Sequence, residues 1–245
     1  MSKDEQWLLK EKYGGMESEG FHADCERLKA GEPLAYVIGW VPFLDCTIWL
    51  DSKPLIPRPE TEFWVEKAIV EIRSGRAAKP RVLDLCAGSG CNGVAVAHHV
   101  PTATMQFTEI EADHLPTIAK NLDAAKIDCT RYQVWQSDLF DAIEGSFDYI
   151  LSNPPYIDPA LDRTEASVKV YEPEVALYGG RGGMEVIERI ITAAPTYLIP
   201  AGQLWLEHEP EQTTAIQSLA KEYGFTSTTH TDQYGVERYS VLVLQ

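Results

Sequence analysis

The sequence has few of the features that mark exported or membrane-bound chains. Its five cysteines are odd in number and scattered, which argues against a disulfide framework and favours a reducing cytoplasm. No apolar run approaches the length needed to span a bilayer. The segment Met1–Tyr13 lacks the basic, apolar and small-residue pattern of an export signal. We therefore expect a cytoplasmic protein that does not associate with membranes.

Basic residues are also scarce. The chain has 21 Lys and Arg against 37 Asp and Glu, for a net charge of −16, and contains no Lys/Arg run. Such a surface repels phosphate backbones, so a protein or small-molecule partner is favoured over DNA. The acidity does not itself indicate a basic protein partner, because the need for solubility is enough to explain it. The six histidines show no metal-ligand spacing, and we expect no metal site.

The first part of the chain reads as helices and a hairpin. With 245 residues and no internal repeat, the chain has the size of one large domain or of a domain with a small appendage. Apolar spacing and turn residues give the expected elements. These are helices at 3–13 and 19–29, the second ended by Gly31, a hairpin of Val37–Phe43 and Cys46–Leu50, and a helix from Glu60 to Arg73 after three prolines.

From Pro80 onwards, short apolar runs alternate with helical patterns, which predicts parallel βαβ units and a doubly wound α/β sheet. The expected strands are 81–85, 104–110, 132–135, 148–152 and 203–207, and the expected helices are 91–99, 112–125, 184–197 and 211–223. Pro195 is expected to kink or end its helix. The last two strands, 226–230 and 239–244, have no helix between them, so they should pair antiparallel if they are neighbours.

A glycine loop, Asp84–Gly90, follows the first of these strands and opens a helix. Its glycines allow a sharp turn and close approach to a ligand, and Glu109 lies about twenty residues on, the spacing of a carboxylate that binds ribose hydroxyls. The loop lacks the full dinucleotide fingerprint, because Asn92 and Gly93 follow it, and it lacks the Lys-Ser/Thr of a P-loop. It suits an adenosine with a non-phosphate group, such as S-adenosylmethionine; an ordinary strand-to-helix turn is the alternative.

The motif Asn153-Pro154-Pro155-Tyr156 follows the strand at 148–152. The prolines hold Asn153 and Pro154 extended. The side-chain oxygen of Asn153 and the carbonyl of Pro154 can then accept the two N–H bonds of a carboxamide, and Tyr156 offers a face for stacking. A proline-stiffened loop with a buried tyrosine is the structural alternative.

Together these motifs resemble the protein-(glutamine-N5) methyltransferases of peptide-chain release factors, the HemK/PrmC type. The resemblance covers about residues 31–245. The residues that carry it are Gly31–Tyr36 with Gly39, Phe43, Ile56–Glu62, Val82–Asp84, Gly88–Gly90, Asn121, Ser137–Phe140, Ser152–Ile157, Tyr171–Pro173 with Ala176 and Leu177, Glu207 with Gln212, and Asp232 with Gly235 and Arg238. The segment Ile56–Glu62 is the most specific, since Asn-Pro-Pro-Tyr also occurs in DNA adenine methyltransferases.

The resemblance implies a class I methyltransferase with a mostly parallel seven-stranded sheet and a C-terminal antiparallel strand. It implies S-adenosylmethionine as cofactor and the glutamine of a release factor's Gly-Gly-Gln motif as substrate. The implied cofactor-binding residues are Cys86, Ala87, Gly88, Ser89 and Gly90 around the methionine part, Glu109 at the ribose, Asp138 and Leu139 at the adenine, Asn153, and Phe43, Pro57 and Arg58 as a wall. The implied substrate-binding residues are Asn153, Pro154, Pro155 and Tyr156, of which Asn153, Pro154 and Tyr156 are catalytic.

The expected organisation is a short N-terminal helical segment at 1–30, reduced relative to the family, a hairpin and linker at 31–60, and the methyltransferase domain at 61–245. The chain departs from the family pattern at Cys86-Ala87, where Gly-Thr is common, and at Asn92. A nucleic-acid adenine-N6 methyltransferase and a non-catalytic cofactor-binding protein remain as alternatives. The carboxylates Glu207, Glu209 and Glu211 are interpreted as a solvated cluster, and Glu172 as a possible partner of backbone near the Asn153 motif.

Overall fold

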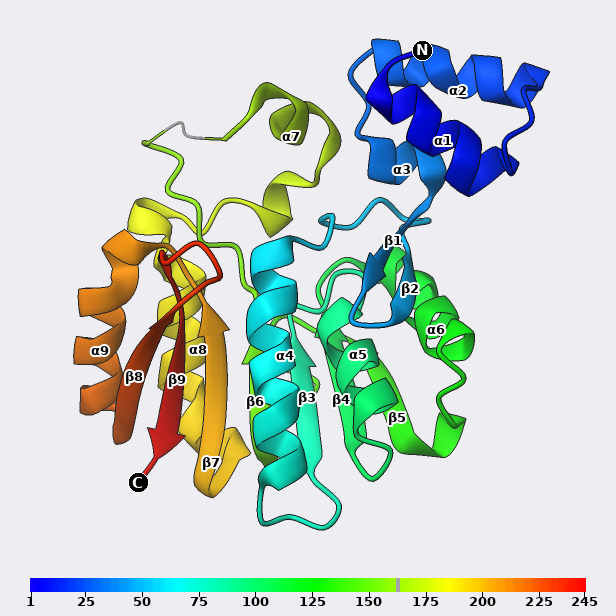
Figure 1. Ribbon diagram of the computed structural model, residues 1–245. Helices are drawn as coiled ribbons and strands as arrows, with labels where there is room; N and C mark the ends of the chain where they lie inside the picture. Colours follow the sequence, from blue (N-terminus) through cyan, green and yellow to red (C-terminus); the bar gives the residue numbers. More distant parts are fainter. Residues whose placement is uncertain (162–163) are drawn as a thin grey trace.

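The protein is described by a computed structural model that covers residues 1–161 and 164–245, and a sheet of seven strands forms its centre (Figure 1). The strands are β3 (Arg81–Leu85), β4 (Thr104–Glu109), β5 (Tyr132–Gln136), β6 (Phe147–Ser152), β7 (Leu198–Glu207), β8 (Phe225–Thr231) and β9 (Glu237–Leu244). Their order across the sheet is β5-β4-β3-β6-β7-β9-β8. The five strands from β5 to β7 are parallel, and β9 pairs antiparallel with both β7 and β8. The predicted doubly wound sheet and its antiparallel last strand are confirmed.

Helices cover both faces of the sheet, because the side chains of each central strand alternate between two cores. In β3, Val82 packs with α4, α5 and α6 on one face, whereas Leu83 packs with α8 and α9 on the other. These helices are α4 (Pro59–Ser74), α5 (Cys91–His99), α6 (Leu115–Ala124), α8 (Glu185–Tyr197) and α9 (Thr213–Glu222). Short 3₁₀ turns lie at η1 (Ala112–His114), η2 (Cys129–Arg131), η3 (Glu174–Ala176), η4 (Arg181–Gly183) and η5 (Pro210–Gln212).

Two predicted boundaries were wrong. Val37 and Ile38 belong not to a strand but to α3 (Leu34–Ile38), which Pro33 precedes and which Gly39 ends with a φ of 99°. The hairpin is therefore shorter, with β1 (Trp40–Phe43) paired to β2 (Cys46–Trp49). Strand β7 begins at Leu198, directly after the helix that contains Pro195, and not at Gln203 as expected. Since α8 ends at Tyr197, Pro195 stands in its last turn.

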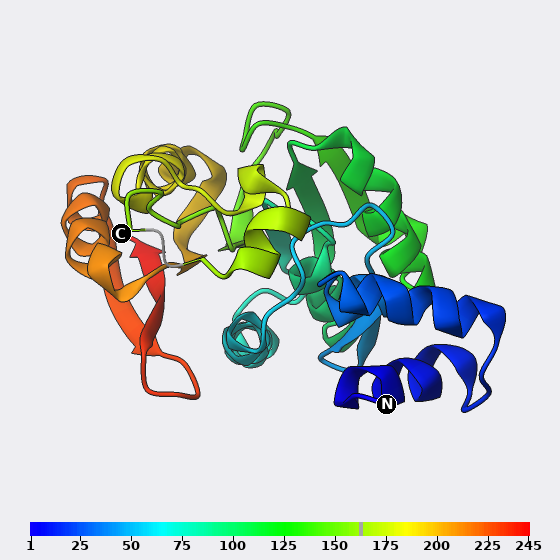
Figure 2. The ribbon, with the colours of Figure 1, turned by 90° about the horizontal axis from the view of Figure 1, so that it is seen from above.

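The N-terminal helices form a small cluster with its own core. Leu8, Phe21, Cys25 and Val37 are buried together between α1 (Lys3–Tyr13), α2 (Glu19–Lys29) and α3. This cluster lies beside the β1–β2 hairpin and away from α8 and α9 (Figure 1). Seen from above, α7 (Ala166–Tyr171) lies over the carboxyl ends of the strands, between the N-terminal helices and α8 (Figure 2). Among the residues that the structure describes, no helix is long and apolar enough to cross a membrane.

Candidate active site

The glycine loop leaves β3 in a left-handed conformation. Its φ angles are 60° at Cys86, 54° at Gly88 and 76° at Gly90. Glycine adopts this region freely, but a cysteine there is strained, and Cys86 is the position at which the chain departs from the family's glycine. Asn121 on α6 fixes the outside of the loop, since its Nδ2 donates to the carbonyl of Ser89 over 2.8 Å. The backbone of the loop is thus held in a tight turn at the carboxyl end of the sheet.

Glu109 ends the neighbouring strand β4 and bonds to the same loop. Its Oε2 accepts the N–H of Gly88 over 2.7 Å, and its Oε1 accepts the N–H of Glu111 over 3.0 Å. The side chain is 7% exposed. A carboxylate has about four acceptor sites, so two remain for hydroxyl donors from the cavity. This arrangement suits the ribose contact that the sequence predicted.

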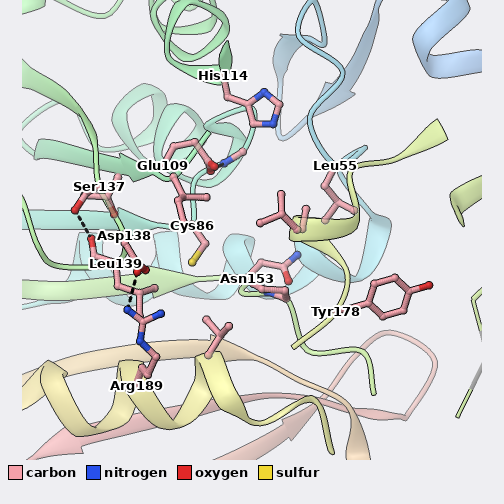
Figure 3. Close-up of a pocket in the computed structure, with 17 residues that line it drawn as sticks. Leu55, Cys86, Glu109, His114, Ser137, Asp138, Leu139, Asn153, Tyr178 and Arg189 are labelled. Atoms are coloured by element: carbon pink, nitrogen blue, oxygen red, sulfur yellow. Dashed lines mark hydrogen bonds and ion pairs between the residues drawn. The ribbon is translucent and has the colours of Figure 1, made fainter. Parts of the chain in front are cut away.

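A cavity of about 240 Å³ opens in front of these groups (Figure 3). Of the predicted cofactor residues, those that line it are Cys86, Gly88, Glu109, Asp138, Leu139 and Asn153. Ala87, Ser89 and Gly90 are not among its lining residues. Burial raises the pKa of the Cys86 thiol and so disfavours the thiolate, and the side chain contributes an apolar part of the cavity wall.

The rim of the cavity near β5 is shaped by a second turn. Leu139 has a φ of 51°, and its carbonyl accepts the hydroxyl of Ser137 over 2.9 Å. Asp138 pairs with Arg189 of α8 over 2.9 Å, and Figure 3 shows this pair at the edge of the cavity. An apolar side chain, Leu139, and a charged one, Asp138, therefore stand next to each other at this rim of the cavity.

The motif Asn153–Tyr156 leaves β6, the strand next to β3. Asn153 lines the first cavity and also a second one of about 200 Å³. Pro154, Tyr156 and Arg58 line the second cavity, and Pro155 lines the first. The two cavities meet at Leu55, Asn153 and Ala176, which line both. Asn153 thus stands at the boundary between the two cavities.

Glu207 is not part of a solvated cluster, and that interpretation was wrong. It is 1% exposed and lies under the Asn153 motif. Its Oε2 accepts from Thr61 Oγ1 over 2.7 Å and from Trp64 Nε1 over 2.6 Å, and its Oε1 accepts the hydroxyl of Tyr156 over 2.9 Å. Burial raises the pKa of Glu207, and these three donors oppose that rise. These three hydrogen bonds offset the cost of burying the carboxyl group of Glu207.

The opposite side of the motif rests on a glycine turn. Gln212 donates its Nε2 to the carbonyl of Tyr156 over 2.7 Å and to that of Gly182 over 3.1 Å. A Cβ on Gly183 would lie 1.9 Å from the carbonyl oxygen of Tyr156, and one on Gly179 would lie 2.4 Å from that of Pro155. The motif therefore packs directly against a backbone that leaves no room for side chains.

The linker before α4 is tied to the region above the motif. Glu172 accepts from Arg58 over 2.6 Å and from the N–H of Ile56 over 3.1 Å, which confirms its expected contact with backbone. Arg58 consequently faces the second cavity and not the first. Phe43 is 1% exposed and packs in the core beneath α4 and α5, so the structure places it in the core and not in a cavity wall.

Several lining residues were missed from the sequence. His114 is 6% exposed and lines the first cavity (Figure 3). Its Nδ1 lies 2.8 Å from Ser52 Oγ. Arg189 and Tyr178 come from segments far along the chain. The sequence offered no signal for them, because none lies in a motif and only the tertiary structure brings them to the cavity.

Comparisons with known proteins give the chain its relatives. Residues 68–171 match the family model described as Methyltransferase small domain. A release factor glutamine methyltransferase of Lactococcus lactis is 33% identical over 94% of this chain and 84% of its own length. The enzyme of the same name from Bordetella pertussis is 36% identical over 87% of this chain and 78% of its own length.

Solved structures agree on the fold. A methyltransferase from Pyrococcus furiosus aligns with a TM-score of 0.59 at 16% identity, over 91% of this chain and 96% of that one. The catalytic domain of human METTL16, in complex with an RNA hairpin, aligns with a TM-score of 0.62 at 15% identity, over 82% of this chain and 76% of that one. They confirm the class I methyltransferase fold. Given the identity and coverage of its curated relatives, the chain belongs to the release factor glutamine methyltransferase family.

Proposed function

We propose that the protein transfers a methyl group from S-adenosylmethionine to the side-chain amide nitrogen of the glutamine in the Gly-Gly-Gln motif of a peptide-chain release factor. The names of its relatives support this substrate. The placement of Asn153 on the boundary between two cavities carries the proposal. One cavity would hold the methyl donor and the other the glutamine.

The first cavity has the groups that this donor requires. Glu109 keeps acceptor sites for the two ribose hydroxyls. The wall of Cys86, Leu139 and Ile110 is apolar and suits the adenine and the sulfonium substituents. When bound, S-adenosylmethionine supplies a methyl group on positively charged sulfur, which is already activated for transfer.

The chain's own residues then have to place and activate the amide. The lone pair of an amide nitrogen is delocalised into its carbonyl, so this nitrogen is a poor nucleophile. Asn153 Oδ1 and the carbonyl of Pro154 accept its two N–H bonds and raise the electron density on nitrogen. They also hold it in line with the methyl group, where orientation lowers the barrier.

The methyl transfer does not require a base in the site. The N–C bond forms as the C–S bond breaks, and the electron pair of that bond returns to sulfur. The methylated amide, which is positively charged at that point, releases one of its protons to water. Burial and Glu207 keep the pKa of Tyr156 well above its ordinary value, so this residue stays a phenol that donates to Glu207.

Mass spectrometry of a release factor incubated with the protein and S-adenosylmethionine tests the proposal. We expect a mass increase of one methyl group on the Gly-Gly-Gln peptide. Asn153→Ala should lower the rate by about 100-fold, the typical loss when one transition-state hydrogen bond is removed. A release factor with Gln→Ala in that motif is the control and should stay unmodified. Transfer to DNA or RNA but not to the release factor would contradict the proposal.

A further inference from the structure

Asn153 hydrogen-bonds to only one side chain among those that the structure describes, the hydroxyl of Thr61. The Nδ2 atom of Asn153 lies 3.2 Å from Thr61 Oγ1. Thr61 stands in the first turn of α4, 92 positions before Asn153, and is 2% exposed. A side-chain amide can turn over and exchange its oxygen and nitrogen, so the role of Asn153 depends on what Thr61 permits.

The hydroxyl proton of Thr61 is used in a hydrogen bond to Glu207. Its hydroxyl lies 2.7 Å from Glu207 Oε2, and the indole N–H of Trp64 lies 2.6 Å from the same oxygen. An indole N–H can only donate, so Oε2 is an acceptor. Thr61 therefore donates its single proton to Glu207 and has only lone pairs left for Asn153.

This leaves one orientation for the Asn153 amide. With Nδ2 towards Thr61, a hydrogen bond forms, and Oδ1 is the atom left to accept from the cavities. In the reverse orientation, Oδ1 would face the lone pairs of Thr61, and the two oxygens would repel each other. Thr61 is 2% exposed, so this contact between two acceptors would be made at a buried hydroxyl, and the reverse orientation is costly.

We propose that Thr61 is a specificity-determining positioning residue, which fixes Asn153 as an acceptor and so selects a carboxamide over a carboxylate. The inference rests on the proposed function. A glutamine side chain brings two N–H donors to Asn153 Oδ1 and to the Pro154 carbonyl. A glutamate side chain at the same position brings only acceptors, which meet two oxygens. Glutamate could gain a donor only if Asn153 turned over, and Thr61 prevents this.

Peptide binding can test the proposal without turnover. The probes are two fluorescent peptides that differ only in Gly-Gly-Gln or Gly-Gly-Glu, titrated against the protein with S-adenosylhomocysteine present. The variants are Thr61→Val, which keeps the shape but cannot accept, and Thr61→Ser, which keeps the hydroxyl. We expect Thr61→Val to lower the ratio of the two affinities by about tenfold, the effect of one hydrogen bond. Thr61→Ser should keep the wild-type ratio.

Steady-state methylation of the glutamine peptide gives the second readout. Thr61→Val should lower kcat more than it raises KM, because a turned amide still allows binding but does not activate nitrogen. Thr61→Ala replaces Thr61→Val if the latter does not fold. A folded Thr61→Val or Thr61→Ala protein with the wild-type affinity ratio would overturn the inference. Absence of methylation by the wild-type protein would instead contradict the proposed function.

Discussion

The glycine loop and the Asn153 motif follow adjacent strands, β3 and β6, yet different parts of the chain hold them. The glycine loop is shaped by its own backbone and by groups that follow it closely, such as Glu109 and Asn121. The Asn153 motif is held by residues remote in sequence: Thr61 and Glu207, on either side of it, bond to each other across 146 positions. One half of the site is therefore local in the sequence, and the other half depends on the assembled fold.

The largest expected effect is on the Asn153 motif. In Gly183→Ala, the new Cβ would lie 1.9 Å from the backbone oxygen of Tyr156, so the motif must shift. A displacement of about 1 Å costs about 100-fold in rate. We expect kcat for methylation to fall by about that factor while the cofactor still binds. Calorimetry and steady-state kinetics measure the two.

Gly182→Ala is the matched control for this change. Gly182 has a φ of 66°, close to the 67° of Gly183, but a Cβ there would meet no atom within 4 Å. Both variants carry the same backbone strain, of about 1 kcal/mol. Equal losses of kcat in the two variants would show that strain, and not the contact with Tyr156, matters.

A smaller effect is expected at the glycine loop. Glu109→Gln must turn its NH₂ group towards the N–H of either Gly88 or Glu111, because both oxygens of Glu109 accept. Leaving one donor of the loop unpaired costs about 1–3 kcal/mol, so the Kd of S-adenosylmethionine should rise by a factor between about 5 and about 150. Glu111→Gln is the control, since only the backbone of Glu111 makes this bond. An unchanged Kd in Glu109→Gln would show that the loop does not need its carboxylate.

The smallest effect on activity is expected at Asp84, in β3 at the start of the glycine loop. Its Oδ2 accepts the N–H of Gly93 over 2.8 Å, and burial raises its pKa from 3.8 to about 8. A carboxyl with a raised pKa stabilises the folded state fully below its unfolded pKa, and this contribution disappears as the pH rises through about 8. Asp84→Asn keeps the acceptor for Gly93, so kcat at pH 7 should change by less than about threefold.

Chemical unfolding at pH 5 and pH 9 measures this contribution. The free energy of unfolding of the wild-type protein, relative to Asp84→Asn, should fall between the two pH values. A difference that is constant or grows with pH would contradict the raised pKa. Such a result would mean that Asp84 is ionised in the folded protein. The glycine loop would then, like the Asn153 motif with Glu207, rest on a buried carboxylate.

The glycine loop, which is held by nearby residues, and the Asn153 motif, which is held by remote ones, also differ in how much the sequence could predict. The strand–glycine–helix pattern, the position of Glu109 and the proline-stiffened Asn153 motif are local signals, and the structure places them at one edge of the sheet. The surroundings of the Asn153 motif could not be predicted. A glutamate after a strand is typical of a solvated loop, and Glu207 is buried only because α4 brings Thr61 and Trp64 over it.

The hairpin shows the same limit at a smaller scale. Val37 and Ile38 are β-branched and apolar, which favours a strand by pattern. They form a helix because Pro33 starts it, Gly39 ends it, and Val37 is needed in the core of the N-terminal cluster. Phe43 is a similar case. The family resemblance implies that it forms a cavity wall, but the packing of the fold buries it in the core.

The Glu207 carboxylate also sets the sequence of events by which the protein becomes competent. During synthesis, the glycine loop and Glu109 are complete well before β7 emerges. The anchor for Thr61 arrives only with Glu207, 146 residues after it. The orientation of the Asn153 amide is therefore fixed only once β7, which carries Glu207, has joined the sheet.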